Sequence, residues 1–103
     1  MKEYIKNTLT NHRNSIDRLD KILIFTLAER FKNTNEIGLL KAKENLPSYD
    51  ETREKAQMNK FNKLAIENDL DPKLVSEFFN IIISEVKRNH ESLKKSMSNL
   101  NNE

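Results

Sequence analysis

The chain has 103 residues, of which 33% are charged and 36% hydrophobic, and its formal net charge is +2. This length predicts a single domain, 1–103, and the near balance of 18 Lys and Arg against 16 Asp and Glu disfavours a nucleic-acid partner. The absence of cysteine excludes disulfides and thiolate zinc sites, and two histidines are too few for a histidine-based metal site. We therefore expect no metal.

The N-terminus has no apolar segment of signal-peptide length. The longest apolar run, residues 22–25, is far shorter than the ~20 residues needed to cross a membrane. The sequence therefore predicts a soluble cytoplasmic protein without a membrane partner.

Helical periodicity without any strand pattern indicates an all-α fold. Breaks near the two prolines divide the chain into three helices, predicted at residues 5–43, 50–68 and 72–97, and a frayed tail at 98–103. The first helix would be about 58 Å long, which is too long for a compact monomer of this size.

Each predicted helix carries an apolar stripe with steps of three and four residues. In the first helix the stripe is Ile5, Leu9, Ile16, Leu19, Leu23, Leu27 and Ile37. The second helix begins near Asp50, and its stripe is Met58, Phe61 and Ala65. The third begins with Asp71 as N-cap and Pro72 at its first position, and its stripe is Val75, Phe79, Ile82, Val86, Leu93 and Met97.

Charged residues interrupt these stripes. Arg13, Arg30 and Lys41 lie in the stripe of the first helix that otherwise holds Leu and Ile, and Asp20 lies there too and could pair with a cation. Asp50 and Glu54 precede Met58 by two turns and one turn on the second helix, and His90 follows Val86 by one turn on the third. A buried charge without a partner is very costly, so these cations indicate a bound anion.

Arg13 and Arg30 are seventeen residues apart, or about 25 Å along one helix. They cannot both bind one small molecule from the same chain, so a shared pocket requires a second, antiparallel copy. The sequence thus predicts a homodimer with two pockets for a small dicarboxylate that carries a hydroxyl. Each pocket would be lined by Arg30, Lys41, Asp50, Glu54 and His90 of one chain and Arg13 of the other.

Five of these six residues also have a purely structural interpretation. Arg13 could extend to water, Lys41 could complement a helix dipole, Asp50 could be only an N-cap, and Glu54 could pair with a neighbouring lysine. His90 could be structural. The single glycine, Gly38, lies inside the first helix at a cost of ~1 kcal/mol, which indicates close approach of another backbone or of a ligand.

Four short segments of the chain form a recognisable set. Three lie in the first helix: Arg13-x-x-Ile16-x-x-Leu19-Asp20, Leu27-Ala28-Glu29-Arg30 and Glu36-Ile37-Gly38-x-x-Lys41. The fourth leads into the second helix: Pro47-Ser48-Tyr49-Asp50-x-x-Arg53-Glu54. Together they resemble the AroQ class of all-α chorismate mutases. The resemblance implies three helices per chain that intertwine in a homodimer, in which each pocket takes an arginine from the partner.

The resemblance also implies the roles of the site residues in rearranging chorismate to prephenate. Arg30 and the second copy's Arg13 would bind the two carboxylates of chorismate, and Lys41 a carboxylate and the ether oxygen. Asp50 and Glu54 would orient the ring, with Glu54 accepting from the ring hydroxyl, and Arg53 would support the carboxylates. The reaction is pericyclic, so no cofactor is expected.

Two positions depart from the family pattern. Val86 stands where the family often has a small hydroxyl residue, and it cannot donate a side-chain hydrogen bond. His90 stands where the family has Gln or Glu, and it could still donate to the ether oxygen from a ring nitrogen. The resemblance thus implies Lys41, Glu54 and His90 as catalytic residues, and with histidine at position 90 we expect activity to depend on pH in the range where histidine titrates.

Three other functions remain open from sequence. An isochorismate-pyruvate lyase would share this fold and cationic pocket. A non-catalytic helical dimer that binds a ligand or partner fits the departures at Val86 and His90. A plain coiled-coil adaptor leaves Arg13, Arg30 and Lys41 in the stripe unexplained.

Overall fold

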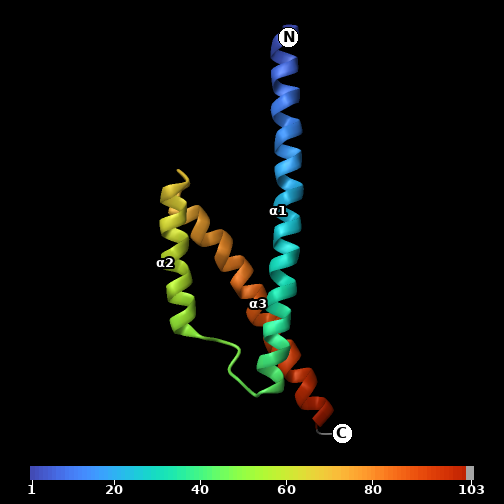
Figure 1. Cartoon of the computed structure of the whole chain (residues 1–103), viewed down its shortest axis with the longest axis vertical. Helices are drawn as coiled ribbons and strands as arrows, with labels where there is room; N and C mark the ends of the chain where they lie inside the picture. The colour runs from blue at the N-terminus through green and yellow to red at the C-terminus, as the bar shows by residue number, and fades with distance from the viewer. Residues whose placement is uncertain (102–103) are drawn as a thin grey trace. The chain divides into compact units, whose positions relative to one another are not determined.

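The computed structural model describes the backbone of residues 1–101 and the side chains of residues 1–99. These residues form three helices and no strand: α1 (Glu3–Lys43), α2 (Glu51–Glu67) and α3 (Pro72–Asn101), shown in Figure 1. The predicted all-α class is confirmed. Contacts within the chain define two compact units, Met1–Asn33 and Thr34–Glu103, so α1 contributes to both.

The helix limits differ from the predicted ones mainly at the ends. α1 begins two residues earlier than predicted, and α2 is one residue shorter at each end because Asp50 and Asn68 are its caps. α3 continues to Asn101, so residues 98–101 of the expected tail belong to the helix. The last two residues of that tail, 102 and 103, lie outside the described residues.

The first unit is the N-terminal part of α1, which continues without a break to Lys43. Its apolar stripe is not covered within this unit. Ile16, Leu19 and Leu23 are 53%, 62% and 52% exposed, and Phe25 is 65% exposed. A single helix cannot bury its own apolar face, so the stripe predicted from periodicity is present but has no partner within the unit.

α1 ends in a Schellman motif built around Asn45. The Leu46 amide donates to the Lys41 carbonyl at 2.7 Å, and the Asn45 amide to the Ala42 carbonyl at 3.4 Å. Asn45 has a φ of 53°, the left-handed conformation that this motif requires and that asparagine tolerates better than most residues. The helix therefore ends at Lys43, two residues after Lys41, and the chain turns into the loop before α2.

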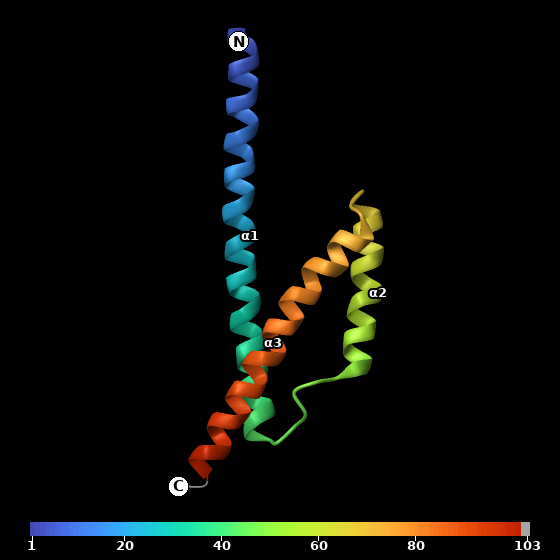
Figure 2. The same cartoon turned by 180° about the vertical axis from the view of Figure 1, so that it is seen from behind.

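α2 and α3 are joined by a second turn of the same kind. The Leu70 amide donates to the Ala65 carbonyl at 2.8 Å, and Asp69 has a φ of 56°. Asp71 then caps α3, because its Oδ1 accepts from the Lys73 amide at 2.9 Å. Two successive signals therefore end one helix and start the next within four residues, and Figure 2 shows the same hairpin from behind.

The core of the second unit lies between α2 and α3. Ala65, Ile82 and Ile83 are its buried apolar residues, and the rings of Phe61 and Phe79 stack with centroids 3.7 Å apart. All residues of the predicted α2 and α3 stripes are buried or half-buried, which confirms those stripes. Within the described residues, no helix is both long and apolar enough to span a membrane.

Candidate functional site

His90 is the most buried polar residue of the second unit, at 5% exposure. Its Nε2 lies 2.8 Å from the carbonyl oxygen of Thr34 on α1. Because a carbonyl only accepts, Nε2 carries the hydrogen and donates it. The other ring nitrogen, Nδ1, is buried and has no hydrogen-bond partner among the described residues. The helical spacing that placed His90 on the α3 stripe is thus confirmed, and its α1 partner could not be predicted.

Gly38 of α1 is buried against side chains of α3, including this histidine. A Cβ on Gly38 would lie 2.6 Å from Cδ2 of His90 and 3.0 Å from Cδ1 of Leu93. Contacts below 3.0 Å require a neighbour to shift, and both neighbours are packed side chains of α3. The only glycine is closely approached, but by side chains of α3 and not by the backbone or ligand that was predicted.

Asp50 performs the structural role that its sequence position allows. Its Oδ1 accepts from the Arg53 amide at 3.1 Å, and its carbonyl accepts from the Glu54 amide at 3.0 Å. The N-cap interpretation is therefore confirmed for Asp50. The cap also fixes the first turn of α2, which carries the exposed side chain of Arg53 and the half-buried side chain of Glu54.

Glu54 is paired with a lysine of α3 and not with one of its own helix. Nζ of Lys87 lies 3.0 Å from Oε2 and 3.3 Å from Oε1 of Glu54. The same Nζ lies 4.2 Å from the centroid of the Tyr49 ring in the loop before α2. One turn along α3, Glu91 accepts a hydrogen bond from the Ser48 hydroxyl. Lys87 was not among the predicted site residues. Its position four residues before Glu91 places both side chains on one face of α3.

The remaining predicted residues are divided between the two units. Lys41 and Val86 are half-buried in the second unit. Arg13 and Arg30 belong to the first unit, where Arg13 is exposed and Arg30 is half-buried with its Nη1 fully covered. Since α1 is continuous, Arg13 and Arg30 are separated by about 25 Å along the helix. The structure therefore keeps these two arginines apart within one chain, as the sequence predicted.

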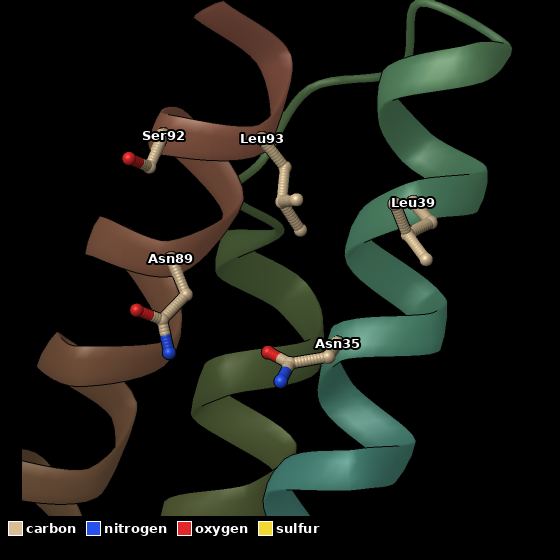
Figure 3. Close-up of a pocket in the computed structure, with 5 residues that line it drawn as sticks. All are labelled: Asn35, Leu39, Asn89, Ser92 and Leu93. Carbon is tan, nitrogen blue, oxygen red and sulfur yellow. The ribbon is translucent and has the colours of Figure 1, made fainter. Parts of the chain in front are cut away.

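A pocket of about 330 Å³ is lined by Asn35 and Leu39 of α1 and by Asn89, Ser92 and Leu93 of α3. In Figure 3, Asn35 and Leu93 point into the space between the two helices, while the hydroxyl of Ser92 points away from α1. None of these five residues belongs to the predicted site. The lining carries no charged side chain, so it offers no counter-ion to an anionic substrate. Among the described residues, no group of three or more His, Asp or Glu is arranged to hold a metal ion.

Comparison with known proteins bears on this arrangement. Residues 12–91 match the family model of chorismate mutase type II. The chain is 33% identical over 97 residues, 94% of its length, to a bifunctional chorismate mutase/prephenate dehydratase of Buchnera aphidicola subsp. Schizaphis graminum. It is 35% identical over 81 residues, 79% of its length, to the protein with the same description from Buchnera aphidicola subsp. Baizongia pistaciae.

The chain spans 25% and 22% of the lengths of these two relatives. The family match covers Arg13, His90 and every predicted site residue between them. It also covers all of α2 and the Asn45 turn that leads into it. The chain belongs to the chorismate mutase type II family.

Proposed function

We propose that this protein is a chorismate mutase, an isomerase that rearranges chorismate to prephenate in the biosynthesis of phenylalanine and tyrosine. The observation that carries the proposal is the family match over residues 12–91, which includes all eight predicted site residues. The half-buried Lys41 and Glu54 add support, because charged side chains withdrawn from water are suited to a charged, hydroxylated substrate.

In this proposal the protein supplies fixed charges and takes no covalent part in the reaction. Arg30 and the second copy's Arg13 bind the carboxylates in two-point fashion, with Arg53 supporting them. Lys41 binds a carboxylate and the ether oxygen, which gains negative charge as the C–O bond breaks. The rearrangement occurs within one molecule, so holding its compact conformer and stabilising that oxygen are sufficient for catalysis.

The other end of the substrate would be held from α2 and α3. Asp50 and Glu54 orient the ring, and Glu54 accepts a hydrogen bond from the ring hydroxyl. Val86 adds only apolar contact. His90 is the second donor to the ether oxygen, and its partnerless Nδ1 is the ring nitrogen left for this role.

We propose further that the active form is a cytoplasmic homodimer in which Arg13 completes the other chain's pocket. Support comes from the apolar stripe of α1, which remains more than half exposed at Ile16, Leu19 and Leu23. Large apolar side chains on one helix face typically mark an interface. A second, antiparallel copy of α1 would cover this face and bring Arg13 to the distant pocket.

The test is formation of prephenate from chorismate by the purified protein, compared with Lys41→Ala. Losing one fixed donor to a developing oxyanion should lower kcat by about 10²- to 10³-fold, or ~2.7–4 kcal/mol. The exposed Lys43, in the last turn of the same helix, gives the control variant Lys43→Ala, which should retain activity.

Isochorismate is the comparison substrate in the same assay. Salicylate and pyruvate from isochorismate, with no prephenate from chorismate, would replace the proposal with the lyase function. No turnover of either substrate would indicate the non-catalytic helical dimer.

A further inference from the structure

We propose that Lys87 is a positioning residue for Glu54, holding its carboxylate ready to accept a hydrogen bond from the hydroxyl of a ring-shaped dicarboxylate substrate. This inference rests on the proposed function, because it concerns the same pocket. It adds a residue of α3 to a set that sequence analysis had limited to Val86 and His90 on that helix.

The ammonium group of Lys87 contacts both oxygens of the Glu54 carboxylate. Nζ of Lys87 lies within hydrogen-bonding or ion-pair distance of both carboxylate oxygens, at 3.0 Å from Oε2 and 3.3 Å from Oε1. A cation that spans both oxygens restrains rotation of the carboxylate group. Each oxygen has more than one lone pair, so Glu54 keeps acceptor capacity for a substrate hydroxyl.

The Lys87–Glu54 pair is less exposed than the ion pairs that the described residues form within single helices. The Glu54 side chain is 26% exposed and that of Lys87 is 40% exposed. The pairs Lys32–Glu29 and Lys55–Glu51 link neighbouring turns of one helix, and their lysine side chains are 72% and 76% exposed. Such exposed pairs contribute little, whereas a partly withdrawn pair between two helices can fix geometry.

Lys87 is itself held in place. Its Nζ lies 4.2 Å from the centroid of the Tyr49 ring, within the range of a cation–π contact. The Ser48–Glu91 hydrogen bond ties the neighbouring loop residue to the next turn of α3. One face of α3 thus contacts both the loop before α2 and the first turn of α2. Lys87 takes part in both, because its Nζ contacts Tyr49 of the loop and Glu54 of α2.

The test is a double-mutant cycle in the intact protein: Lys87→Met, Glu54→Gln and the combination, each assayed for prephenate formation. Lys87→Met should lower kcat/KM by about threefold to tenfold, mainly through a higher KM, because a ring hydroxyl is bound before and during the reaction. In the Glu54→Gln background the same change should have no further effect. Lys87→Arg should restore most of the activity.

Lys95→Met is the matched control, since Lys95 is an exposed lysine of the same helix, and it should leave kcat and KM unchanged. Thermal unfolding of each variant checks the fold, and Lys87→Gln replaces Lys87→Met if the latter does not fold. An equal loss in both Glu54 backgrounds would overturn the inference, since Lys87 would then act independently of Glu54. An unchanged kcat/KM in Lys87→Met would also overturn it. Absence of activity in the wild-type protein would instead refute the proposed function.

Discussion

His90 gives its Nε2 hydrogen to the Thr34 carbonyl, so any hydrogen bond to substrate must come from Nδ1. In the neutral ring with hydrogen on Nε2, Nδ1 has a lone pair and can only accept. Nδ1 becomes a donor when the ring is protonated to the imidazolium. Donation to the ether oxygen therefore requires the cationic form of His90.

We predict that His90→Gln retains most of the activity and that His90→Phe loses it, because an amide donates a hydrogen bond without being protonated and a phenyl ring offers no donor. The measurement is kcat/KM for prephenate formation by both variants. Equal activity of the two variants would show that His90 is structural only.

Gly38 has no room for a side chain, so its substitution should change the stability of the fold. An alanine Cβ would meet Cδ2 of His90 at 2.6 Å, inside a packed contact. Overpacking costs about 1–3 kcal/mol, and replacing a helical glycine returns about 1 kcal/mol of propensity. We expect Gly38→Ala to lower the free energy of unfolding by roughly 1 kcal/mol, measured by urea denaturation.

The matched background is His90→Ala, which removes the ring that the new methyl group meets. There, Gly38→Ala should cost clearly less stability, because the clash with the ring is gone and only the 3.0 Å contact with Cδ1 of Leu93 opposes the gain in helix propensity. An equal loss of stability in both backgrounds would contradict the assignment of the Gly38–His90 contact as the cause.

At this scale the sequence identified the residues but not their partners. Helical spacing put Glu54 and His90 on apolar faces, and both are withdrawn from water. It could not show that Glu54 pairs with Lys87, because 18 Lys and Arg offer many equivalent candidates. Nor could it assign the hydrogen of His90, since the Thr34 carbonyl approaches only once α1 and α3 pack together.

The starts of the second and third helices could be predicted from their capping residues. Asp50 and the Asp71–Pro72 pair are recognisable N-terminal signals, and both start helices where expected. The end of α3 was set too early. Polar composition after Met97 indicated fraying, but no glycine or proline follows, and the helix continues to Asn101.

The turn between α2 and α3 places Asp69 in a strained backbone conformation. Asp69 has a φ of 56°, a conformation that is unfavourable for residues with a Cβ. Glycine removes this cost, and Asp69→Gly should therefore raise the free energy of unfolding by about 0.5–1 kcal/mol in urea denaturation.

The neighbouring position provides the control for this prediction. Asn68 has a φ of −107°, where glycine has no advantage and adds freedom to the unfolded chain. Asn68→Gly should therefore be destabilising. If Asp69→Gly lowered stability as much as Asn68→Gly, the left-handed turn would not be a source of strain.

For the molecule as a whole, periodicity identifies an apolar face but not what covers it. The α2 and α3 stripes pack against each other within the chain. The α1 stripe has the same spacing of three and four residues, yet its Leu19 and Leu23 side chains are 62% and 52% exposed. The prediction of a second chain rests on the length of the first helix and the separation of Arg13 from Arg30, and it stays a prediction.

Subunit complementation tests this proposed sharing of Arg13. Arg13→Ala and Lys41→Ala should each abolish most activity as homodimers, because both pockets then lack one cation. In a mixed dimer, one pocket combines the Lys41 of one chain with the Arg13 of the other and is intact, while the second pocket lacks both.

Unfolding and refolding equal amounts of the two variants together should form mixed dimers as half of all dimers, each with one intact pocket. The specific activity should then recover to about a quarter of the wild-type value, since the two pockets of a symmetric dimer are equivalent. Refolding each variant alone controls for the procedure. If Arg13 served its own chain's pocket, every pocket in the mixture would still lack one cation, and activity would stay at the level of the separate variants.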